Sequence, residues 1–198
     1  MRGARHFFLP VAAVVLGGLF LDASPSHAQG MGRGTGDGTA NEQPTRKTPA
    51  MSLRVYDRLS EAQECAEMDD IVCANEKLTE VREMRNLNSY ELAQMWNFYA
   101  FIAFGQNNYA DAIIAYENVL LQVDLPLGME TTTRFTLCQL YFQEENYQDS
   151  LDMLSEWFAI AENPGPDPYI LRAQIFYQLQ QFREGIEPVL QAIEVAEL

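Results

Sequence analysis

Three cysteines are the residues of this chain whose type and spacing point most directly to chemistry: Cys65, Cys73 and Cys138. Cys65 and Cys73 flank a short segment around Met68-Asp69-Asp70. If two antiparallel helices join there, the two sulfur atoms come within bonding reach in an oxidising compartment. We expect a disulfide between Cys65 and Cys73, which would contribute about 2–3 kcal/mol in the chain-entropy model. The alternative is a pair of small buried side chains.

Carboxylates are the other candidates for chemistry, and their spacing favours structural roles. Glu67, Asp69 and Asp70 lie close together, but they lack the ligand spacing and the glycine of a calcium-binding loop. A helix start is the simpler interpretation, because carboxylates favour the positive end of a helix dipole. No pattern places two carboxylates in a pocket for glycoside hydrolysis, and no glycine-rich phosphate loop precedes a helix. We therefore expect no metal and no cofactor.

The first 28 residues have the pattern of a secretory signal peptide. Arg2 and Arg5 give a positive start, residues 7–21 form an apolar stretch, and Ser26-His27-Ala28 offers small residues for cleavage. The apolar stretch is shorter than the roughly 20 residues of a membrane span. We expect cleavage rather than an uncleaved anchor, and a mature chain without an integral membrane span.

Cleavage would remove both histidines of the chain, His6 and His27. Histidine is the commonest general base and a frequent zinc ligand. Its loss disfavours Ser-His and Cys-His catalysis and most zinc sites. We expect that the protein is not an enzyme.

The mature chain would be strongly acidic. Without Arg2, Arg5 and Asp22, the 13 basic and 28 acidic residues fall to 11 and 27. From Leu87 onward, 16 carboxylates stand against three arginines. Such a surface repels nucleic acid and would attract a basic segment of a partner protein, although the charge could also serve solubility alone.

Two regions follow the signal peptide. Residues 29–50 are rich in Gly, Thr and Pro and nearly free of apolar side chains, so we expect a flexible tether. Beyond the tether, apolar residues recur every three or four positions, which predicts helices. Turn-forming residues at 105–108 and 143–146 would lie within helix pairs, and those at 124–128 and 163–166 between pairs. The pattern predicts an all-α domain of eight helices, about 12–16 residues each, in four antiparallel pairs.

A tetrad with a bulky residue three positions before a small one recurs at spacings of 38, 38 and 35 residues. Its copies are Ile71–Ala74, Tyr109–Ala112, Tyr147–Ser150 and Phe182–Gly185. A second small residue stands twelve positions before the end of each copy: Ala62, Ala100, Cys138 and Ala173. This pattern resembles the tetratricopeptide repeat (TPR). Arg58 and Arg134 stand where that repeat usually has an aromatic residue.

The resemblance to TPR proteins implies an architecture for residues 51–198. It is an α-solenoid of about four TPR-like helix pairs, a right-handed superhelix, with units near 55–88, 89–127, 128–165 and 166–198. In that repeat, small residues at the end of the tetrad and twelve positions before it let paired helices pack closely. We therefore assign Cys138 to packing.

Four segments add a narrower resemblance: Asn88–Glu91, Met95–Phe101, Glu117–Leu120 and Trp157–Pro164. They are similar to segments of exported repeat proteins of Gram-negative bacteria that are linked to TonB energy-transducing systems. In that family the repeat protein is thought to assist the inner-membrane complex that drives nutrient uptake. The resemblance implies a periplasmic location and TonB-complex components as partners.

In stacked helix pairs of the TPR kind, the first helix of each pair lines a concave face. The resemblance places nine residues on this face, which we name the predicted groove: Asn97, Phe101, Phe104, Phe135, Gln139, Phe142, Ile170, Gln174 and Tyr177. Leu59, Gln63 and Ala66 hold the same positions in the first unit. Amides can hydrogen-bond the backbone of a bound peptide, and aromatic rings supply apolar contacts. Any single ring could instead be buried against a neighbouring helix.

The leading hypothesis is a non-enzymatic scaffold in the periplasm that holds a peptide or helix of an envelope protein in this groove. It would be an accessory component of a TonB-type complex. One alternative is an assembly factor for another envelope complex. Another is a structural protein that self-associates through its last helix, near residues 188–198.

Overall fold

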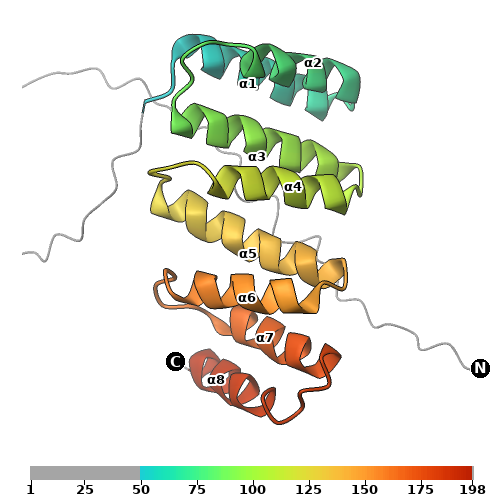
Figure 1. Ribbon diagram of the computed structural model, residues 1–198, viewed down its shortest axis with the longest axis vertical. Helices are drawn as coiled ribbons and strands as arrows, with labels where there is room; N and C mark the ends of the chain where they lie inside the picture. The colour runs from blue at the N-terminus through green and yellow to red at the C-terminus, as the bar shows by residue number, and fades with distance from the viewer. Residues whose placement is uncertain (1–49, 198) are drawn as a thin grey trace, which may run out of the picture. The chain divides into compact units, whose positions relative to one another are not determined.

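The structure is a computed structural model that describes residues 50–197 (Figure 1). These residues fall in the second of the two units into which the chain divides, Arg46–Leu198. The predicted signal peptide at 1–28 and the predicted tether at 29–50, apart from Ala50, lie outside the described residues.

The described residues form eight α-helices and contain no strand, which confirms the all-α prediction for this part of the chain. The helices are α1 (Leu53–Glu67), α2 (Ile71–Arg82), α3 (Ser89–Gly105), α4 (Tyr109–Leu120), α5 (Leu127–Gln143), α6 (Tyr147–Phe158), α7 (Pro166–Gln178) and α8 (Ile186–Ala196). Helices α3 and α5 have 17 residues each and α8 has 11, so these three fall outside the predicted length range.

Each odd-numbered helix packs most extensively against the helix that follows it, so the eight helices form four pairs. Successive pairs contact one another through α2 and α3, α4 and α5, and α6 and α7. Figure 1 shows the helices following one another in sequence order, from α1 and α2 at one end to α7 and α8 at the other. Isolated helices of this length are marginal in water, so each pair depends on its neighbours for stability.

The turn inside each pair repeats one backbone geometry. The second residue after the end of each first helix has a left-handed conformation: Asp69 (φ 60°), Asn107 (φ 58°), Glu145 (φ 62°) and Gln180 (φ 60°). The next residue donates its N–H to the carbonyl five positions earlier, as Asn108 does to Ala103 at 2.9 Å. This is the Schellman arrangement, which satisfies carbonyl groups at a helix end. It allows the chain to reverse between the two helices of a pair.

Small side chains lie where the two helices of a pair approach each other. Ala74, Ala112 and Ser150 of the tetrads are all fully buried. Ser150 Oγ donates a hydrogen bond to the carbonyl of Cys138 at 2.7 Å, so α5 and α6 touch at these two residues. A Cβ on Gly185 would lie 3.6 Å from the carbonyl oxygen of Ala173, which is the equivalent contact in the last pair. A larger residue at the end of a tetrad would push the helices of its pair apart.

The fourth tetrad differs from the other three, because it does not open a helix. Helices α2, α4 and α6 begin at the first residue of their tetrads, whereas Phe182–Gly185 forms a turn and α8 begins at Ile186. Pro188 gives the physical reason. A helix starting at Phe182 would place this proline in its interior, where the missing N–H breaks the hydrogen-bond ladder. With a start at Ile186, Pro188 lies in the first turn, where no N–H donor is needed.

Candidate functional site

The predicted groove occupies one face of each of three helices. Its members are Asn97, Phe101 and Phe104 on α3, Phe135, Gln139 and Phe142 on α5, and Ile170, Gln174 and Tyr177 on α7. A spacing of four and then three residues puts the members of each helix on the same side. The six members on α3 and α5 are half-buried, and the three on α7 are exposed. All nine side chains are therefore at least partly accessible to solvent.

Several aromatic rings of the groove also serve the fold. The ring pairs are Phe104 with Tyr109 (5.6 Å between centroids), Phe142 with Tyr147 (5.5 Å) and Phe135 with Trp157 (5.2 Å). Each pair joins the two helices of one helix pair. Only part of the surface of Phe104, Phe135 and Phe142 is thus left for contact with a partner.

The amides of the groove are not used to hold the described helices together. Asn97, Gln139 and Gln174 make no side-chain hydrogen bond to another residue within the range 50–197. Each amide offers two N–H donors and a carbonyl acceptor, which are the groups that pair with a peptide backbone. Together with the accessible faces of Phe101 and Ile170, they form a mixed polar and apolar surface.

The first unit does not extend this surface, which corrects one expectation. Leu59 was expected to line the groove, but its side chain is fully buried. Val55, Leu59 and Ala62 are all fully buried and recur at helical spacing, so Leu59 belongs to the core stripe of α1. Gln63 Nε2 donates to Glu67 at 2.9 Å, so its amide is already engaged. The accessible groove is limited to α3, α5 and α7.

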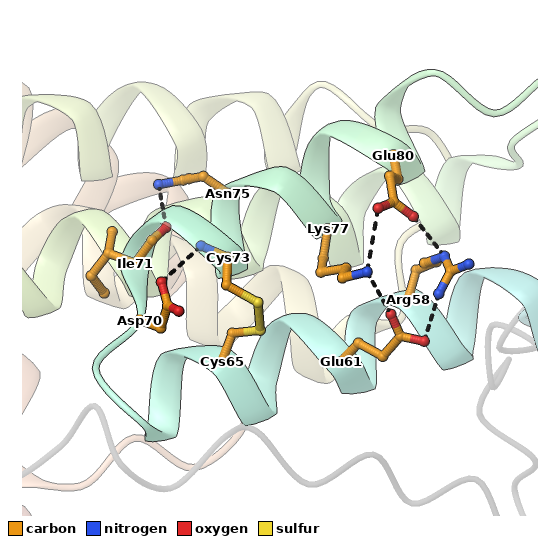
Figure 2. Close-up of a disulfide and its surroundings, with 9 residues drawn as sticks. All are labelled: Arg58, Glu61, Cys65, Asp70, Ile71, Cys73, Asn75, Lys77 and Glu80. Carbon is orange, nitrogen blue, oxygen red and sulfur yellow. Dashed lines mark hydrogen bonds and ion pairs between the residues drawn. A yellow bond between two sulfur atoms is a disulfide. The ribbon is translucent and has the colours of Figure 1, made fainter.

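Cys65 and Cys73 are joined by a disulfide with an S–S distance of 2.00 Å and Cα atoms 5.7 Å apart (Figure 2). The bond links the last turn of α1 to the first turn of α2. Asp70 caps α2, because its Oδ1 accepts the N–H of Cys73 at 3.0 Å. Of the three carboxylates, Asp70 starts a helix as expected, whereas Glu67 ends α1 and Asp69 lies in the turn. No group of three or more Asp, Glu, Cys or His side chains that could hold a metal ion occurs in the described part of the chain.

Cys138 is a free, buried cysteine on α5. Burial raises the pKa of its thiol to about 12. The thiolate is the reactive form of cysteine, and at neutral pH this thiol stays protonated. Cys138 is therefore an inert packing residue in the folded protein.

Arg58 forms ion pairs between α1 and α2. Its Nε lies 2.8 Å from Glu80 on α2, and Lys77 Nζ lies 3.0 Å from Glu61 on α1 (Figure 2). The hydrogen bond from Lys77 lowers the pKa of Glu61, and the same bond raises the pKa of Lys77. Four alternating charges thus connect the two helices at a half-exposed surface.

Arg134 repeats this arrangement in the third pair. It contacts Glu130 on its own helix at 3.0 Å and Glu156 on α6. In both pairs the glutamate on the second helix follows its arginine by 22 positions. In both pairs an arginine and a glutamate connect the two facing helices, so these charges have a structural role.

Glu91 is a buried carboxylate that sequence reasoning did not single out, and it is only 3 % exposed. It accepts hydrogen bonds from the Ser52 N–H at 2.8 Å, the Ser52 hydroxyl at 2.6 Å and the Asn88 N–H at 2.9 Å. Burial alone would raise the pKa of Glu91, but the bonds from Ser52 and Asn88 outweigh burial and lower it. The available signal was Asn88-x-x-Glu91, which forms a capping box at the start of α3.

Two open hollows lie on other surfaces. One, of about 590 Å³, is bordered mainly by α1 side chains that include Arg54 and Glu61. The second, of about 280 Å³, is bordered by Trp96 and Tyr99 of α3 and Ile114 of α4. Neither hollow is lined by a residue of the predicted groove, so the groove is a separate surface.

The helices between residues 50 and 197 are each too short or too polar to cross a membrane. Comparisons of the chain with protein-family models and with curated proteins found no match.

Proposed function

We propose that this chain is a non-enzymatic protein–protein interaction scaffold of the periplasm, and that its groove on α3, α5 and α7 holds a peptide or helix of a partner protein. The observation that carries the proposal is the set of accessible amides, Asn97, Gln139 and Gln174, beside accessible apolar side chains on the same helix faces. A bound peptide presents backbone N–H and C=O groups to such amides and side chains to the apolar surface. The predicted signal peptide supports the periplasmic location.

The four helix pairs are proposed to stack as a TPR-like α-solenoid with a right-handed superhelical twist. Three observations support this: the turn geometry repeated in every pair, the small-residue contacts between paired helices, and the packing of each pair on the next. In a solenoid the first helices of successive pairs share a concave face. The groove residues of α3, α5 and α7 would then form one continuous binding surface.

The partner is proposed to be a component of a TonB-type energy-transducing complex in a Gram-negative envelope. The four segments that resemble repeat proteins of such systems support this choice. Charge supports it too, because 16 carboxylates and three arginines from Leu87 onward would attract a basic segment. Affinity that depends on this attraction should fall as salt is raised.

Capture of the partner on three baits tests the proposal. The full chain, exported in a Gram-negative host, is compared with a groove variant carrying Phe101→Ala and Gln139→Ala. The control bait carries Ile114→Ala, at an exposed position of α4 outside the groove. We expect a TonB-complex component on the wild-type and control baits and its loss from the groove variant. A different envelope protein with the same pattern would remove the TonB link, and equal capture on all three baits would overturn the groove.

A further inference from the structure

Helix α8 carries a row of exposed apolar side chains. They are Ile186 (60 % exposed), Val189 (46 %), Leu190 (55 %) and Ile193 (52 %). Positions separated by three, four and seven residues share one face of a helix, so the four side chains form a single stripe. Within residues 50–197, α8 packs on α7, and this stripe remains open.

The positions equivalent to Val189 in the three earlier pairs are buried. Val189 lies four residues after the end of its tetrad. The residues at the same place in the earlier pairs are Leu78, Tyr116 and Leu154, which are 0 %, 6 % and 0 % exposed. Tyr116 belongs to a core cluster with Leu137 of α5, and Leu154 to one with Leu171 of α7. In both clusters the helix that follows in the chain contributes apolar side chains. Val189, at the centre of the α8 face, thus lies at a position that is buried in each of the other three helix pairs.

A direct contact shows what covers such a face. The Phe158 ring of α6 lies 5.0 Å from the Tyr169 ring of α7, centroid to centroid. Ile193 holds the corresponding position in α8, 35 residues later, which is the spacing between the last two tetrads. An apolar side chain from another helix is therefore the expected neighbour of Ile193.

Charge defines the rest of the surface. Glu187 and Glu194 are exposed, lie seven residues apart and border the apolar stripe on one side. Helix α8 contains no Lys or Arg. Glu184 and Glu197 add exposed carboxylates near its two ends. An approaching helix would meet an apolar stripe with a negative border.

We propose that this face of α8 binds an amphipathic α-helix of a partner protein, with an apolar stripe bordered by Lys or Arg. A second copy of this chain fits less well, because packing α8 on α8 would bring Glu187 and Glu194 toward identical carboxylates. This inference rests on the proposed scaffold function. It adds the kind of partner surface that α8 would contact, an apolar helix face bordered by basic residues.

Two synthetic peptides of about 18 residues test the site, a length at which an isolated helix can form. Both carry leucines at i, i+3, i+4 and i+7, and the remaining positions that flank the stripe are lysine in one peptide and glutamate in the other. Their binding to the full chain is measured by isothermal titration calorimetry at low salt. We expect the lysine peptide to bind at least about tenfold more tightly than the glutamate peptide.

Matched variants locate the binding. Ile193→Asp should weaken binding of the lysine peptide at least about tenfold. Ile114→Asp, at a position of almost equal exposure on α4, should leave it unchanged. The groove variant with Phe101→Ala and Gln139→Ala should also leave it unchanged, so failure of the groove and failure of this site are distinguishable. Leu190→Asp serves as a second variant if Ile193→Asp does not fold by circular dichroism.

Three outcomes would overturn the inference. Equal binding of the two peptides would contradict the charge preference. Unchanged binding of the lysine peptide to folded Ile193→Asp or Leu190→Asp would contradict the site. A concentration-dependent dimer in light scattering, abolished by Ile193→Asp, would show that a second copy occupies the face.

Discussion

Replacing Glu91 by glutamine tests how the first two helix pairs are held together. Glu91 accepts two hydrogen bonds from Ser52, just before α1, and one from the Asn88 N–H at the start of α3. Glutamine has nearly the same length but presents one acceptor oxygen and one NH₂ group. At least one donor of this site therefore loses its partner in the variant.

The structure sets the size of the expected effect. Hydrogen bonds to charged groups contribute about 1.5–3 kcal/mol each, and a buried donor without a partner costs about 1–3 kcal/mol. The three bonds share one carboxylate, so their contributions do not simply add. We expect Glu91→Gln to lower the free energy of unfolding by about 2–4 kcal/mol at neutral pH.

The effect of Glu91→Gln should depend on pH with a definite sign. Burial raises the pKa of Glu91, but the hydrogen bonds from Ser52 and Asn88 lower it by more. A carboxyl whose pKa is lowered by folding adds stability above its unfolded pKa, about 4.3. That stability is lost as the pH falls through the folded pKa. The difference between wild type and variant should therefore shrink as the pH is lowered below about 4.

Urea denaturation of the full chain, followed by far-UV circular dichroism at neutral pH and at about pH 3.5, measures this difference. Glu144→Gln is the matched control, because Glu144 is exposed at the end of α5. Its effect should stay within about 0.5 kcal/mol. A loss below about 0.5 kcal/mol for Glu91→Gln, or an equal loss at both pH values, would refute the reasoning.

Replacing Cys65 and Cys73 by serine should lower the free energy of unfolding by about 2–3 kcal/mol in the chain-entropy model, as measured in urea. The serine variant should not respond to reductant, and a response would contradict the role given to the disulfide. The Cys138 thiol, whose pKa burial raises to about 12, should resist iodoacetamide in the folded protein and react after unfolding. Mass spectrometry of the labelled protein checks this, and fast labelling of the folded state would mean that the packing site is open. Gly185→Ala should be nearly neutral, because its Cβ would lie 3.5 Å from Phe176 Cβ, whereas Gly185→Leu should cost about 1–3 kcal/mol through overpacking. Equal thermal stability of these two variants would contradict the close approach.

Much of the helical organisation could be predicted from the sequence because local signals repeat along the chain. Apolar residues at intervals of three and four predict helices, and polar residues mark the turns between them. Asp69 and Asn107 hold left-handed conformations that Asp and Asn tolerate better than most residues do. The start of α8 could not be predicted from the repeat, because Pro188 moves it to Ile186, four residues after the first residue of the tetrad.

The rest depended on contacts that no local pattern encodes. The repeat pattern places Leu59 in the groove, but in the structure its side chain is fully buried on the same face of α1 as Val55 and Ala62. The bonds between Glu91 and Ser52 span 39 residues, so only the capping part of this site was visible in the sequence. Whether an apolar residue such as Val189 is covered also depends on its neighbours in space. Its equivalents in the earlier pairs are buried, and two of them belong to clusters that include residues of the following helix.

The most direct test of the scaffold function places a photo-crosslinking residue at Gln139 of the full chain, and at Ile114 in a separate control. Gln139 lies at the middle helix of the groove, and Ile114 is exposed on α4 outside it. We predict that Gln139 crosslinks to a basic segment of one envelope protein and that raised salt weakens the crosslink. A yield at Gln139 no higher than that at Ile114 would contradict binding in the groove.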